Sequence, residues 1–262
     1  MNILKHEMRA GRKAFFFWMI GMFLLCYVGV VKYESFTTSG SMMELLNSFP
    51  RIFLAIMGAV GVDIGTLSGY TALMFYYVLI CAVIYAVHLG SAAVTRESVD
   101  KTYEFVFSKP CSRARVLGLK LAAAYIYLTL FCIFNGVFVL MAVRSMNAAD
   151  NVTGITWFCT LTSFLISALF VAISAFCASM AKKPEKGALY GNLAFLYAFI
   201  LGVVYNMMEN PGVLKLLSPF NYFSSVDQVA QKLDVTLTAL TLALTCALLC
   251  GSVARFRRKD LV

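Results

Sequence analysis

Six long apolar runs, none of which contains a Lys, Arg, Asp or Glu, constrain the fold of this chain more than any other feature. They cover residues 14–31, 70–94, 121–143, 155–181, 188–208 and 235–254. About 20 apolar residues in a helix cross the roughly 30 Å hydrocarbon core of a bilayer, and a charged residue at the helix centre costs about 2.5–3.5 kcal/mol on insertion scales. All five prolines lie between the runs. The sequence therefore predicts an all-α polytopic membrane protein with six transmembrane helices in a single domain, 1–262.

The positive residues predict how these helices are oriented. Seventeen of the 22 Lys and Arg lie in residues 1–13, 95–120, 182–187 and 255–262. Cytoplasmic segments of membrane proteins carry the excess of Lys and Arg, so both termini and the segment 95–120 are predicted to be cytoplasmic. The same rule accounts for the net charge of +9, and we therefore expect no nucleic-acid partner.

Three segments outside the apolar runs are partly apolar but are too short or too interrupted to span the membrane. Residues 1–13 alternate apolar and basic side chains with helical spacing, which predicts an elbow helix lying at the cytoplasmic interface. Residues 42–58 are apolar but interrupted by a Pro-Arg pair, so we expect an external helix that is too short to span the membrane. Residues 209–234 are apolar in part and contain two prolines. This composition predicts an external loop that re-enters the interface.

Several kinds of chemistry are disfavoured because their motifs are absent. The chain has no G-x-x-x-x-G-K-[ST] loop for a nucleotide, no H-E-x-x-H and no G-x-S-x-G. It has two histidines, no C-x-x-C and no carboxylate within an apolar run, which argues against a histidine-based metal site and against coupling to protons or sodium through intramembrane acids. We therefore predict that the chain is not an enzyme and binds no cofactor or metal. A partner would have to supply the energy for any uphill transport.

Two polar residues within the runs are candidates for lining a pathway or for joining helices. His88 lies toward the cytoplasmic end of the second run, and Asn135 lies near the middle of the third. A buried Asn in a membrane helix commonly hydrogen-bonds a neighbouring helix, and a packing or interfacial role is the alternative for His88. Small residues four apart also recur and would permit close helix approach; among these pairs are Ser174 with Ala178 and Gly187 with Gly191.

The segment 95–120, TRESVDKTYEFVFSKPCSRARVLGLK, contains more charged residues than any other interruption between two adjacent runs. A helix over residues 98–107 would gather apolar side chains on one side and charged ones on the other, as at a membrane surface. Pro110 disfavours helix at the residue before it, and we expect the next helix to begin at Ser112 and Arg113. An ordinary cytoplasmic loop retained by its positive charges would explain the same pattern.

Specific residues of this segment resemble the type-2 permeases of ATP-binding-cassette (ABC) exporters. The loop between the second and third spans of these permeases has an acid, Gly-Thr, two large apolar residues, Pro, Ser-Arg and a Lys that opens the next span. The matching residues here are Glu97, Thr102, Phe105, Phe107, Pro110, Ser112, Arg113 and Lys120. The chain departs from the pattern at Lys101, which replaces the Gly, and at Tyr103, which replaces a common Leu. The stretch 49–70 and the tail 256–261 are also similar to the family.

The resemblance implies that different subunits form the transport pathway and hydrolyse ATP. Two six-span permeases, identical or different, would form the pathway, and two separate ATPase subunits would bind ATP and Mg²⁺ beneath them. The residues expected to contact the ATPase are Glu97, Thr102, Tyr103, Phe105, Phe107 and Pro110, and those expected to anchor the loop are Arg113, Arg115 and Lys120. The expected location is a cell membrane, that of a bacterium.

Two other classes of function fit parts of the same pattern. A membrane subunit used for assembly or signalling would also be compatible with an ATPase partner. A membrane-embedded enzyme would need catalytic polar residues gathered at one depth, and the sequence offers no such cluster. The sequence does not specify a transported substrate.

Overall fold

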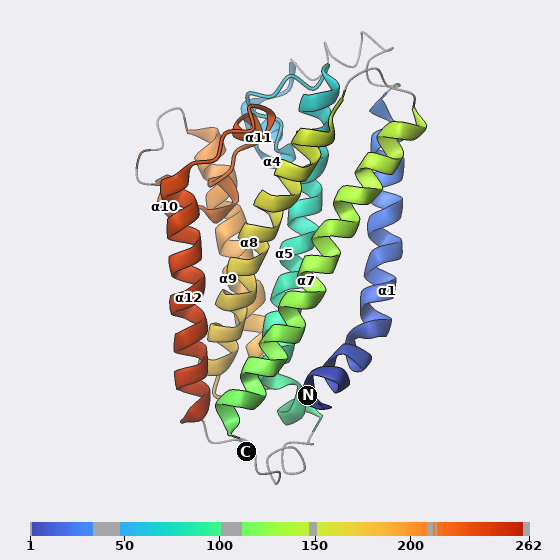
Figure 1. Ribbon diagram of the computed structural model, residues 1–262. Coiled ribbons are helices and arrows are strands. Elements are labelled where there is room, and N and C mark those ends of the chain that lie inside the picture. The colour runs from blue at the N-terminus through green and yellow to red at the C-terminus, as the bar shows by residue number, and fades with distance from the viewer. Residues whose placement is uncertain are drawn as a thin grey trace.

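The computed structural model describes residues 2–33, 48–100, 112–146, 151–208, 212 and 214–258. Six long helices form one bundle (Figure 1), namely α1 (Asn2–Val31), α5 (Leu67–Val99), α7 (Arg113–Ser145), α8 (Thr153–Met180), α9 (Glu185–Met207) and α12 (Val235–Arg257). Short elements lie at one end of it, namely α4 (Arg51–Met57), α10 (Leu214–Leu217), η1 (Pro219–Asn221) and α11 (Ser225–Val229). The other end, where α1 begins and α12 ends, is called the terminal end below.

All six long helices are long and apolar enough to cross a membrane. The described residues contain no strand. The prediction of an all-helical protein with six membrane-spanning helices is therefore confirmed.

α5 and α7 extend well beyond the apolar runs predicted for them. α5 and α7 each have 33 residues, which corresponds to roughly 50 Å at 1.5 Å per residue, whereas the hydrocarbon core measures about 30 Å. The predicted spans 70–94 and 121–143 end where the first charged residues occur, whereas the helices continue past these residues. Charged residues such as Arg96 are compatible with a helix that continues into water.

The boundaries of the segment 95–120 are corrected accordingly. Its first five residues belong to α5, and its last eight residues, from Arg113, belong to α7. The expected start of a helix at Ser112 and Arg113 is confirmed, because the Ser112 hydroxyl accepts a hydrogen bond from the Arg115 amide at 3.3 Å and so caps α7. The helix expected over 98–107 is wrong at its start, since residues 98 and 99 form the last turn of α5. Residues 101–111 lie outside the described residues.

The elbow and the first span form one helix in place of two separate elements. α1 is helical from Asn2 to Val31, and Figure 1 shows its first turns bent away from the axis of the remainder. Gly11 permits a close crossing with α7, because a Cβ at this position would lie 2.7 Å from a ring carbon of Tyr127. Whether residues 2–13 lie at the membrane interface stays a prediction.

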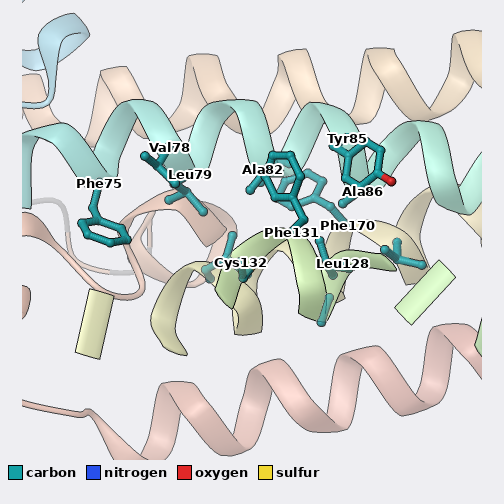
Figure 2. Close-up of a cluster of buried hydrophobic side chains, with 14 of the residues drawn as sticks. Phe75, Val78, Leu79, Ala82, Tyr85, Ala86, Leu128, Phe131, Cys132 and Phe170 are labelled. Atoms are coloured by element: carbon teal, nitrogen blue, oxygen red, sulfur yellow. The ribbon is translucent and has the colours of Figure 1, made fainter. Parts of the chain in front are cut away.

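The core of the bundle is the pair α5 and α8, which share the most extensive helix contact and are the most buried of the six spans. α1 and α7 pack on one side of it, and α9 and α12 on the other. Figure 2 shows aromatic and aliphatic side chains of α5 and α7 facing each other in this core. The rings of Tyr85 and Phe131 stack with centroids 4.8 Å apart.

Small residues set how closely α5, α8 and α9 approach. A Cβ on Gly90 of α5 would lie 2.4 Å from the carbonyl oxygen of Val171 on α8. Cβ atoms on Gly187 and Gly191 of α9 would lie 3.2 Å from Ala178 and 2.6 Å from the Ser174 hydroxyl of α8. The close approach predicted from these small pairs is confirmed.

The helix expected within residues 42–58 is present as α4, which begins directly after Pro50. Pro50 fits the position before the first turn because it lacks the amide that would be left unpaired there. α4 ends at Gly58, whose φ of 75° lies in the left-handed region that Gly adopts without strain. Residues 42–47 lie outside the described residues.

Gly90→Ala is expected to destabilise the bundle, because the added methyl group would meet backbone and not a flexible side chain. Overpacking of this kind costs about 1–3 kcal/mol. Gly118→Ala on α7 is the matched control, since a Cβ there meets nothing within 4 Å and Ala favours a helix over Gly by roughly 0.5–1 kcal/mol. The midpoint of thermal unfolding in detergent should fall for the first variant alone. Equal midpoints would contradict the close contact.

Candidate functional site

Four charged side chains from three helices meet at the terminal end of the bundle. Glu7 comes from α1, Arg96 and Glu97 come from the last turn of α5, and Lys120 comes from the second turn of α7. We call these four residues the ion cluster. Their helices include both of those that lead into residues 101–111.

The distances show that the four groups are mutually paired. Arg96 Nη1 lies 3.0 Å from Glu7 Oε2 and donates a hydrogen bond to it. Lys120 Nζ donates to Glu97 Oε2 and lies 4.0 Å from Glu7 Oε1. Glu7 therefore bridges the cations of α5 and α7, and the two acids balance the two bases.

Burial makes this pairing necessary. The Lys120 side chain is 3% exposed, those of Glu7 and Glu97 are 11% and 15% exposed, and that of Arg96 is 32% exposed. Lys120 lies among buried apolar residues of α7, such as Leu117 and Leu121. An ammonium group removed from water is tolerated when acids pair with it, and removal of one partner of a buried pair costs about 3–5 kcal/mol.

A second contact fixes α1 at the residue directly after Glu7. The Tyr127 hydroxyl of α7 donates a hydrogen bond to the carbonyl oxygen of Met8. The ring of Phe15 lies 5.2 Å from the ring of Tyr127. Together with the ion cluster, these contacts hold the first half of α1 against α5 and α7.

The predicted site residues fall into three groups. Glu97 and Lys120 are brought together in the ion cluster, so the Glu97 carboxylate is turned toward Lys120 within the same chain. Arg113 and Arg115 are exposed in the first turn of α7. The other predicted contacts lie outside the described residues; these are Thr102, Tyr103, Phe105, Phe107 and Pro110. The proposed roles of all these residues toward an ATPase or headgroups stay predictions.

Sequence reasoning missed Glu7 and Arg96 as members of the site. One signal was available, because Glu7 is the single acid among the basic residues of the segment 1–13. Its partners lie 89 and 113 positions further along the chain, and no local pattern connects residues so far apart.

The two polar residues within the spans have different environments. Asn135 is fully buried, its amide donates to the Phe131 carbonyl at 2.8 Å, and its oxygen lies 3.9 Å from the Cys26 sulfur of α1. It therefore lies at the interface of α1 and α7. His88 is exposed on α5 and lines a cavity together with Asn192 of α9.

At the other end of the bundle, η1 inserts a ring between α8 and α9. The centroid of Phe220 lies 5.5 Å from that of Phe170 and 6.0 Å from that of Phe195. Phe195 is 12 residues before the end of α9 at Met207, which places it roughly 18 Å from that end. The Asn221 amide donates to the Gly202 carbonyl at 2.9 Å and fixes the turn. The re-entry of residues 209–234 into the membrane stays a prediction, and the depth of Phe220 supports it.

The site offers no catalytic arrangement within the described part of the chain. No group of three or more His, Cys, Asp or Glu residues there could hold a metal ion. The ion cluster is charge-balanced, and three of its four side chains are largely removed from solvent. It joins α1, α5 and α7.

The six apolar helices define a polytopic helical membrane protein. The family described as "ABC-2 family transporter protein" matches residues 1–261, and the chain belongs to this family. Membership implies association with an ABC ATPase and with a lipid bilayer. A comparison with curated proteins finds no match.

Lys120→Met is expected to destabilise the bundle, because Glu97 loses the cation with which it pairs and Glu7 keeps only Arg96. The cost of removing a buried partner is about 3–5 kcal/mol, which thermal unfolding in detergent would report as a lower midpoint.

Arg115→Met in the same helix is the control, since Arg115 is exposed, and its midpoint should stay near that of the wild type. The double variant Lys120→Met with Glu97→Gln should recover part of the loss. A single Lys120→Met variant as stable as the wild type would refute the pairing.

Proposed function

We propose that this chain is the membrane subunit of an ABC exporter and that a separate ATPase drives it through residues 95–120. The ion cluster is the observation that carries this proposal. It ties together the two helices that flank residues 101–111 and the first half of α1, so that a force applied to this segment would reach three of the six spans.

The energy source is assigned to a partner because the chain has no nucleotide-binding loop. ATP and Mg²⁺ would be bound by the ATPase subunit. Closure of two such subunits would displace residues 101–111, and α5 and α7 would carry this displacement into the bundle as continuous rods of 33 residues each. The family membership implies such a partner.

The transport pathway would require a second six-span permease, either an identical chain or a related one. Residues 209–234 would control its outer exit, supported by the insertion of Phe220 between α8 and α9. Export is the direction of movement that the resemblance to type-2 exporter permeases implies.

The proposal places the terminal end of the bundle in the cytoplasm of a bacterial cell, on the basis of the Lys and Arg distribution. Green fluorescent protein fused after Val262 should fluoresce, because this reporter folds in the cytoplasm and not after export through the general secretion channel. A fusion that ends after Lys232, before α12, should be dark and serves as the control. The reverse pattern would overturn the orientation.

Phe105 and Phe107 are expected to anchor the ATPase, and Phe105→Ala with Phe107→Ala should weaken its binding by more than about tenfold. Truncation of aromatic anchors at the centre of an interface costs about 2 kcal/mol or more. The measurement is co-purification with the partner ABC ATPase, together with the stimulation of ATP hydrolysis.

Phe49→Ala with Phe53→Ala is the matched control, because both rings are exposed near α4, at the end of the bundle away from the termini. This control should bind and stimulate as the wild type does. If the Phe105 and Phe107 variant also retains full binding and stimulation, the proposed ATPase contact is wrong.

A further inference from the structure

A small polar cavity lies next to the turn that inserts Phe220 between α8 and α9. Its volume is about 30 Å³, and its walls come from α5, the last turn of α9, the loop after α4, and η1 with α11. None of its lining residues is exposed. The lining residues with polar side chains are Tyr76, Asn206, Asn221, Ser224, Ser225 and Gln228. The cavity therefore combines polar walls with shelter from bulk solvent.

The Gln228 amide at this cavity is buried but has weak hydrogen-bond partners in the protein. The residue is 4% exposed. Its Nε2 donates to the Thr162 hydroxyl and to the Phe223 carbonyl oxygen, both at 3.4 Å, and its Oε1 accepts from the Cys159 thiol at 3.5 Å. Hydrogen bonds from an amide to an oxygen usually measure about 2.7–3.2 Å, and a thiol is a weak donor. A further, shorter hydrogen bond would therefore stabilise this amide.

Three other polar groups at the cavity have hydrogen-bonding capacity that the described residues do not use. Asn221 is 5% exposed, and its Nδ2 donates to the Gly202 carbonyl and to the Ser218 hydroxyl. Its Oδ1 accepts no hydrogen bond from the described part of the chain. Within the same residues, the Tyr76 hydroxyl and the Asn206 side-chain amide form no hydrogen bond.

We propose that this cavity binds a pair of water molecules, which bridge η1 and α11 to α5 and α9. A buried site needs about 10–15 Å³ for each water molecule and about two to four polar partners. The volume and the polar lining of this cavity meet both conditions. The partners of the waters are Tyr76 on α5, Asn206 on α9, Asn221 in η1 and Gln228 on α11.

The chemistry of the cavity favours water over a metal ion or an apolar ligand. No carboxylate is among the lining residues, and the Asp227 carboxylate of α11 accepts a hydrogen bond from the Ser224 hydroxyl at 2.6 Å. A divalent cation would therefore lack the acidic ligands that such ions use. An apolar ligand would leave the amides of Asn221 and Gln228 without further partners, which is costly for buried polar groups.

The two waters link the turn that carries Phe220 to the long helices. Phe220 and Phe223 both line the cavity, so their rings lie next to the waters. Water-mediated hydrogen bonds are nearly as favourable as direct ones, and in this way the waters help to hold η1 and α11 against α5 and α9. The site is separate from the ion cluster and from the ATPase contact, and it does not depend on the proposed transport function.

Hydroxyl-radical footprinting of the purified chain in detergent tests the proposal. An X-ray pulse splits water where it is bound, and the radicals oxidise adjacent aromatic rings even when these rings are buried. Mass spectrometry of the peptides then gives the rate of oxidation for each ring. In the wild type, Phe220 and Phe223 should be oxidised several times faster than Phe75, which is also buried on α5 but does not line the cavity.

Tyr76→Phe with Asn206→Leu removes two of the four partners of the waters. Oxidation of Phe220 and Phe223 in this double variant should fall toward the rate of Phe75. Tyr77→Phe with Asn192→Leu is the matched control, because it makes the same two substitutions on the same two helices at residues that do not line the cavity. The control should keep the wild-type rates.

Two results would overturn the proposal. Oxidation of Phe220 and Phe223 in the wild type as slow as that of Phe75 would mean that the cavity is dry. Unchanged oxidation in the variant of Tyr76 and Asn206 would mean that radicals reach the rings from bulk solvent. Phe131, which is fully buried on α7, reports unfolding of any variant, and the wild-type comparison decides the proposal even if a variant unfolds. Since the measurement uses the chain without any ATPase, its failure leaves the transport proposal intact.

Discussion

The buried ammonium group of Lys120 is the point on which the terminal end of the bundle depends. It lies among apolar side chains of α7, where water cannot solvate it. Acids of α1 and α5 must therefore lie next to it and compensate its charge. This requirement fixes the register of three helices at once. Glu7 then draws in Arg96, and the carbonyl of Met8 receives the Tyr127 hydroxyl. The bent start of α1 is thus a consequence of one charge in the second turn of another helix.

Away from the terminal end, close packing of small residues, and not ion pairing, holds the helices together. Gly90, Gly187 and Gly191 bring α5 and α9 onto α8 so closely that a methyl group at any of the three would collide with α8 or with its neighbours. Lipid provides no hydrophobic drive between helices, so close packing of small residues must supply the attraction. The bundle therefore has a closely packed centre, with the ion cluster at its terminal end and the inserted Phe220 near the other end.

The sequence predicted the number of spans and the small-residue contacts because both are local properties. Hydropathy identifies the segments that cross the hydrocarbon core. The i to i+4 spacing of Ser174 and Ala178 places these two residues on one helical face. It failed at the ends of α5 and α7, because charges such as Arg96 end the apolar run without ending the helix. It failed at the ion cluster for a different reason. The pairing of Glu7, Arg96 and Lys120 depends on how three distant segments are arranged in space. A local stretch of sequence carries no information about this arrangement.

The balance of two acids and two bases in the ion cluster has an electrical consequence. A charge that crosses a membrane potential of 100 mV gains or loses about 2.3 kcal/mol, whereas Glu7, Arg96, Glu97 and Lys120 sum to zero. A shift of the ion cluster along the membrane normal therefore moves no net charge through these four residues, and the voltage dependence of such a shift would come from other charges on the same helix ends, such as Arg9, Arg113 and Arg115.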